Sequence, residues 1–102
     1  MPPTKEALKT RLLQIAREDF PAAARAGKYP IRFDHCLLRV VYDNLFGAQW
    51  QTVLDPKKPA IHQLSTEELE NAIELAEAVT ADKETCATLN RKSLEFRGKL
   101  RA

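Results

Sequence analysis

Apolar residues recur every three or four positions along the first twenty residues, which is the spacing of one face of an α-helix. Thr4 precedes this run and suits the N-cap, where a side-chain oxygen accepts a hydrogen bond from a free backbone N–H. Pro21 lacks a backbone N–H, so it either stops this helix or forces a new one. The residues expected to face the core are Leu8, Leu12, Ile15, Ala16 and either Asp19 or Phe20.

A second helix is predicted to start at Pro30 or Asp34 and to end or kink at Gly47. Proline suits the first helical position, aspartate suits a cap, and glycine suits the turn that closes a helix. Residues 49–54 are expected to add a helical turn or two before the proline-containing break at residues 55–59. The predicted buried side of this helix carries Phe33, Leu37, Val40, Val41 and Asn44.

Two further helices are predicted in the second half of the chain. Ser65 and Glu68 have the spacing of a capping box, and Leu64 with Leu69 supplies the matching hydrophobic staple. Asp82 is expected to cap the last helix. The third helix is expected to bury Leu69, Ala72, Ile73, Ala76 and either Val79 or Thr80. The fourth is expected to bury Cys86, Leu89, Ser93, Phe96 and Leu100.

These segments predict an all-α fold, a small bundle of about four helices forming a single helical domain over residues 1–102. The stretch YPIRFDHCLLRVVYDNLFGAQW, residues 29–50, holds the only Trp, both Tyr and two of the four Phe. We therefore expect the second helix to be central and flanked by the other three.

Composition supports an ordinary globular domain, with 44% hydrophobic and 29% charged residues and a net charge of +2. The N-terminal segment has no long apolar run or cleavage site, and no stretch approaches the length of a membrane span, so we expect a cytoplasmic protein without membrane contact. Cys36 and Cys86 are expected to be reduced thiols on the inner faces of helices.

A polar stripe along the second helix is the strongest candidate site. Its members recur at three- and four-residue spacing, so their side chains share one face. We interpret this face, together with Trp50, as a contact surface for a protein partner, because Arg, Tyr and Trp dominate interface energetics. The competing interpretation is an ion pair between Arg39 and Asp43 that seals the edge of the core. The candidate partner-binding residues are Arg32, His35, Arg39, Tyr42, Asp43 and Trp50.

The basic end of the last helix offers a second hypothesis, nucleic-acid binding through phosphate contacts. Phe96 is available to stack on a base, although it also falls on the apolar stripe. A homo-oligomer is a third alternative, because Phe46 and Trp50 beside a glycine can leave an apolar patch exposed. The candidate nucleic-acid-binding residues are Arg91, Lys92, Arg97, Lys99 and Arg101.

Catalytic, metal and cofactor chemistry is not favoured by the residues. His35 and Cys36 are neighbours on a helix, so their side chains diverge by about 100° and cannot form a productive dyad. A zinc site from these two with His62 and Cys86 lacks the short paired spacing of structural zinc sites. We expect no catalytic residue, no metal and no cofactor.

Residues 29–50, with PAIHQLSTEELENAIELAEAV and LNRKSLEFRGK further on, resemble a family of short bacterial proteins that is well represented in cyanobacteria. Members often carry the label N-acetyltransferase-like, so the resemblance implies an enzyme that uses acetyl-CoA. The chain departs from that label, because it lacks the (Gln/Arg)-x-x-Gly-x-(Gly/Ala) turn that holds the pyrophosphate of acetyl-CoA and shows no series of strands. No acetyltransferase residue can be assigned.

Overall fold

The chain begins with one long helical rod built from three consecutive elements. In this computed structural model, which describes residues 4–98, α1 (Lys5–Gln14) continues through the π-turn η1 (Ile15–Asp19) into α2 (Phe20–Gly27). Thr4 caps α1 as predicted, accepting a hydrogen bond from the N–H of Ala7 over 3.1 Å. Pro21 does not stop the rod, because the wider π-turn precedes it and the N–H of Phe20 reaches back five residues to the carbonyl of Ile15.

Lys28, and not Gly27, takes the left-handed conformation that ends the rod, with a φ of 53°. Gly27 is needed for a different reason. A Cβ at this position would lie 2.5 Å from Cε1 of Tyr29, whose ring packs edge-on against Phe20. The hydroxyl of Tyr29 donates to the carbonyl of Thr80 over 2.7 Å, which ties the end of the rod to a later helix.

α3 (Asp34–Phe46) starts at the second of the two predicted positions and ends at Gly47, which has a φ of 65°. Two short 3₁₀ turns follow, η2 (Trp50–Thr52) and η3 (Ala60–Gln63). The proline-containing break between them is ordered by Gln63. Its side chain accepts from the N–H of Asp55 over 2.8 Å and donates to the carbonyls of Asp55 and Lys58 over 2.9 and 3.1 Å.

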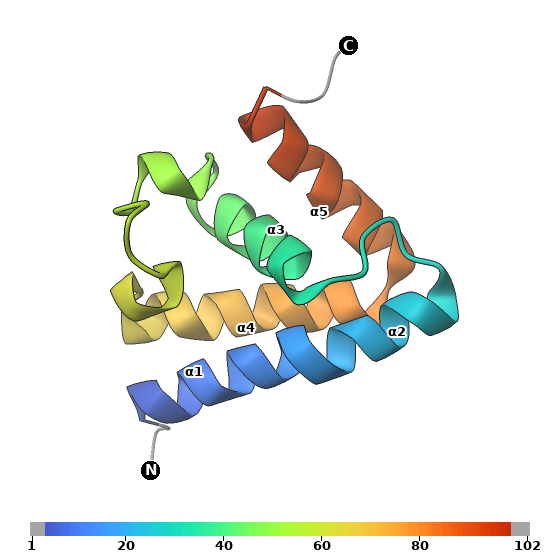
Figure 1. Cartoon of the computed structure of the whole chain (residues 1–102), viewed down its shortest axis with the longest axis horizontal. Helices are drawn as coiled ribbons and strands as arrows, with labels where there is room; N and C mark the ends of the chain where they lie inside the picture. The colour runs from blue at the N-terminus through green and yellow to red at the C-terminus, as the bar shows by residue number, and fades with distance from the viewer. Residues whose placement is uncertain (1–3, 99–102) are drawn as a thin grey trace.

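The last two helices are α4 (Thr66–Ala81) and α5 (Lys83–Phe96). Ser65 and Glu68 form both hydrogen bonds of the predicted capping box, and Asp82 caps α5 as predicted. In Figure 1 the α1–α2 rod and α4 run side by side, while α3 and α5 lie across the other side of α4. No strand occurs within residues 4–98, which confirms the all-α bundle of four long helical segments.

The core lies between these helices and includes the predicted stripes of α1, α3 and α4. Leu12, Val40 and Leu69 are fully buried. The expected central position of α3 is shared with α4. α3 packs against η1, α2, α4 and α5, and α4 packs against the whole rod as well as against α3 and α5. None of the helices within residues 4–98 is both long and apolar enough to cross a bilayer.

Two aromatic residues predicted to be buried lie at the surface. Phe33 precedes α3 in extended conformation and is 62% exposed, because the helix starts after it and its side chain is not directed by the helical period. Phe96 is 38% exposed at the last residue of α5, where its neighbour Arg97, and not Phe96, is the residue bonded to α3. Leu100, also predicted to be buried, lies outside the described residues.

Candidate functional site

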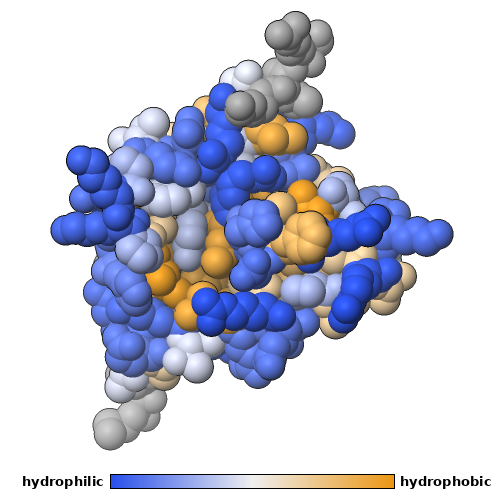
Figure 2. All heavy atoms as spheres, in the orientation of Figure 1, coloured by the Kyte–Doolittle hydropathy of each residue, from blue (hydrophilic) through white to orange (hydrophobic). Residues whose placement is uncertain are grey.

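Two adjoining hollows open on the face that α3 shares with α1 and with the loop between α3 and α4. The larger has a volume of about 510 Å³ and the smaller about 370 Å³. Both are lined by Leu38, Tyr42 and Trp50, which therefore form a shared wall. We refer to the two hollows together as the groove. Figure 2 shows apolar atoms at the recessed middle of this face with hydrophilic residues around them.

The larger hollow joins three parts of the chain. α1 and η1 contribute Leu13 and Arg17, and η3 contributes Ile61 and His62. The position of η3 depends on the Gln63 hydrogen bonds described above, which close the loop before it. The remaining lining residues are Glu6, Lys9, Thr10, Pro59 and Ala60.

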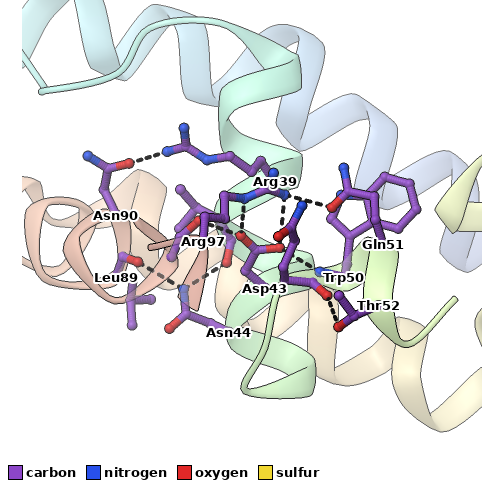
Figure 3. Close-up of polar contacts among 12 residues, drawn as sticks. Arg39, Asp43, Asn44, Trp50, Gln51, Thr52, Leu89, Asn90 and Arg97 are labelled. Atoms are coloured by element: carbon purple, nitrogen blue, oxygen red, sulfur yellow. Dashed lines mark hydrogen bonds and ion pairs between the residues drawn. The ribbon is translucent and has the colours of Figure 1, made fainter. Parts of the chain in front are cut away.

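Asp43 lies beneath the smaller hollow and fixes its walls. Its carboxylate is fully buried and accepts four hydrogen bonds from three residues, which lie at the end of α5 and in η2 (Figure 3). Ser93 Oγ and Arg97 Nε each donate to Oδ2 over 2.6 Å. The second oxygen, Oδ1, accepts from the N–H of Trp50 over 2.9 Å and from Arg97 Nη2 over 3.1 Å. A carboxylate with this many donors compensates much of the cost of burial.

These bonds set the orientation of the groove. Because Asp43 holds the backbone of Trp50, η2 begins directly beside α3, and the indole packs edge-on against the ring of Tyr42 with centroids 6.1 Å apart. Arg97 also donates to Oε1 of Gln51 over 3.0 Å, so α5 and η2 are joined as well. Asp43 is therefore a positioning residue for the shared wall.

The predicted contact surface is only partly present. His35, Arg39, Tyr42 and Trp50 line the smaller hollow. Arg32 lies apart from the groove, with Pro30, Ile31, Phe33 and Cys36 around a separate shallow hollow. The assignment of Asp43 as a contact residue is wrong, because its side chain has no exposed surface.

The alternative ion pair between Arg39 and Asp43 is also wrong. Asp43 turns toward α5 and pairs with Arg97, whereas Arg39 extends to Asn90 and donates to its side-chain oxygen (Figure 3). Arg39 Nε is buried without a hydrogen-bond acceptor in the described structure. Its guanidinium thus has one neutral partner and no carboxylate within 4.0 Å among residues 4–98.

The proposed nucleic-acid surface on α5 loses its central member. Arg97 is 14% exposed and its charge is offset by Asp43, so it is not free to bind phosphate. Arg91 and Lys92 are exposed, and Lys99 and Arg101 lie outside the described residues.

The groove contains few groups suited to catalysis. Burial raises the pKa of the Tyr42 hydroxyl, so this phenol stays protonated at neutral pH and cannot act as a base. His35 is exposed and stacks on Phe33 with the ring planes 4° apart. Within residues 4–98, no three His, Cys, Asp or Glu side chains lie close enough together to hold a metal ion.

Several lining residues were missed in the sequence. Leu13 and Leu38 fall outside the buried stripes of their helices, and an apolar residue in such a position is the signal that could have identified them. His62 and Arg17 carry no comparable signal, because single polar residues on the surface of helical segments are common. Comparisons of the chain with protein-family models, with curated proteins and with solved structures found no match.

Proposed function

We propose that the protein is a helical binding module that receives a segment of a protein partner in the groove. The observation that carries this proposal is the shared wall of Leu38, Tyr42 and Trp50, with a hollow on each side of it. Adjoining hollows suit a chain segment that places successive apolar side chains in them, as in helix-in-groove recognition.

The composition of the wall supports a protein ligand. Trp offers a large contact area that loses little conformational entropy on binding, which is why it is a frequent anchor of interfaces. Trp50 is the partly exposed aromatic residue of the wall, whereas Tyr42 is 5% exposed and supports it from behind. Trp50 is already held on the backbone side by Asp43 and on the ring side by Tyr42. A preorganised aromatic group loses less freedom when a partner binds, so more of the contact energy appears as affinity.

The test is selection of random peptides on the immobilised full chain, followed by binding measurements on variants. Leu38→Glu places a charge in the shared wall and is expected to abolish binding, and Leu13→Gln on the opposite side of the larger hollow is expected to weaken it. Val53→Glu is the matched control, because Val53 is 51% exposed and lines neither hollow. Thermal unfolding of each variant checks the fold. Peptides that bind Leu38→Glu as well as the wild type would contradict the proposal.

A further inference from the structure

The groove has an uneven charge distribution that bears on what binds there. Among residues 4–98, Glu6 is the one carboxylate that lines the groove, and it pairs with Lys9 over 3.2 Å. In the smaller hollow the charge of Arg97 is offset by Asp43 beneath it. Two guanidinium groups remain, Arg17 on the larger hollow and Arg39 on the smaller, and neither has a carboxylate within 4.0 Å in residues 4–98.

Arg39 is the more informative of the two cations. It is half-buried, it has a neutral amide as its hydrogen-bond partner, and its buried Nε has no acceptor. Removing a cation from water without a counter-charge is costly, whereas a carboxylate that reaches a guanidinium gains charge-assisted hydrogen bonds. The residue is thus arranged to gain from an incoming anion.

The other groups that face the smaller hollow do not supply that anion. His35 offers no negative charge, Gln51 is already bonded to Arg97, and Leu38, Tyr42 and Trp50 are uncharged at neutral pH. The surface therefore combines an apolar wall with cations on both sides.

We infer that the segment bound in the groove is acidic and amphipathic, with carboxylates that pair with Arg39 and Arg17 and with apolar side chains that fill the two hollows. This inference rests on the proposed function and adds the chemistry of the partner. Charge complementarity and the apolar wall select this occupant, because an acidic segment without apolar residues leaves the hollows unfilled and a neutral apolar one leaves both guanidinium groups unpaired.

A second copy of this chain matches the groove less well. The exposed face of α4 is acidic, carrying Glu67, Glu70, Glu74 and Glu77. However, the large exposed apolar residues, Phe33, Val53 and Phe96, lie outside α4. The helix α5 carries Phe96 beside Glu95 but also the exposed cations Arg91 and Lys92, so no helix within residues 4–98 combines an acidic face with more than one large exposed apolar side chain. The partner is therefore expected to be a different polypeptide.

The experiment uses the peptides selected from the random library on the full chain. We expect them to be enriched in Asp and Glu alternating with Leu, Phe or Trp. Their affinity is expected to fall about tenfold or more in Arg39→Gln, because a hydrogen bond to a charged group typically exceeds the free energy that corresponds to a factor of ten. The exposed Arg17→Gln is a second variant with little risk to the fold, and it is expected to weaken binding less.

Arg91→Gln is the matched control, because it removes the same charge from an exposed position of α5 outside the groove. It is expected to leave affinity unchanged within about twofold. Raising the salt concentration is expected to weaken binding to the wild type more than binding to Arg39→Gln.

The possible outcomes separate this inference from the proposed function. Neutral or basic peptides that lose affinity in Leu38→Glu but keep it in Arg39→Gln and Arg17→Gln would overturn the acidic partner and leave the binding module in place. Peptides insensitive to Leu38→Glu, or no selected peptides, would overturn both. Self-association that Leu38→Glu and Arg39→Gln abolish, measured by sedimentation, would make a second copy the occupant and overturn the inference.

Discussion

Asp43 and Arg97 lie 54 residues apart in the chain, and the Nε of Arg97 donates to Oδ2 of Asp43 over 2.6 Å. The pair joins the last turn of α3 to the end of α5, and through Trp50 and Gln51 it also holds η2. The wall of the groove is consequently supported by a buried ion pair. Arg97 lines the smaller hollow, whereas the carboxylate of Asp43 has no exposed surface.

Replacing Asp43 by Ala is expected to destabilise the fold by about 3–5 kcal/mol, because it leaves the Arg97 charge and the hydroxyl of Ser93 without their partner. Urea unfolding followed by circular dichroism measures the change. Glu70→Ala removes an exposed carboxylate from α4 and should change stability by less than about 0.5 kcal/mol. Equal effects of the two substitutions would show that the buried pair contributes no more to stability than an exposed carboxylate does.

The two cysteines should differ sharply in reactivity. Burial raises the pKa of Cys86 to about 11, with a backbone hydrogen bond from Ile31 acting in the opposite direction, whereas Cys36 is half-buried near the start of α3. Because the thiolate is the nucleophile, a disulfide reagent at about pH 8 should modify one thiol quickly and the other only on unfolding. Cys36→Ser should remove the fast phase. Two fast thiols in the native protein would contradict the burial of Cys86.

Acid should weaken the start of α5 through Asp82. The hydroxyl of Thr85 donates to this carboxylate over 2.8 Å and, with the backbone N–H groups of Glu84 and Thr85, holds its pKa below the ordinary value of 3.8. A lowered pKa in the folded state gives stability that is present above the ordinary pKa and lost as pH falls below it. Between about pH 5 and pH 2 the wild type should therefore lose more stability than Asp82→Asn, which keeps an N-cap oxygen without the titration. Parallel acid curves for the two proteins would argue against this assignment.

Gly27→Ala should destabilise the protein although alanine is the better helix former. In an exposed helix the substitution ordinarily gains about 0.5–1 kcal/mol. Here the added methyl group meets the ring of Tyr29, which cannot move freely because its hydroxyl is bonded to Thr80. In the Tyr29→Ala background the same substitution should become neutral or stabilising. A double-mutant cycle by thermal unfolding gives the coupling, and a value near zero would show that the ring shifts at no cost.

The sequence predicts the helices well because their signals are local. The Thr4 and Asp82 caps, the Ser65–Glu68 box and the glycine end of α3 each depend on a few neighbouring residues, and each is found as predicted. The buried stripes of α1 and α4 follow from a single period. The predicted burial of Phe33 and Phe96 is wrong because both residues lie at helix ends, where the helical period no longer determines the direction of a side chain.

The site was predicted less well because its pairing is not local. Asp43 has a suitably spaced cation four residues earlier, Arg39, and nothing within α3 shows that Arg97 arrives from another helix instead. The hollow beside α1 also requires Leu13 and Ile61 to approach one another through the fold. Distances between elements that are separate in sequence depend on packing, which periodicity does not encode.

The π-turn of residues 15–19 contains one residue more than an ordinary α-helical turn needs. The stability of the rod therefore depends on the number of residues in this segment as well as on their identity. A helix with one residue fewer there could close as an ordinary α-helix and still present Phe20 to the core, but the ring of Pro21 would then meet the carbonyl four positions earlier at a cost of about 3 kcal/mol. Deletion of Arg17 should therefore be harmful alone and largely tolerated together with Pro21→Ala, as thermal unfolding of the two variants would show. The π-turn contains one extra residue, and that residue allows Pro21 to continue the helix without a clash. Each of the two features is therefore tolerated because the other is present.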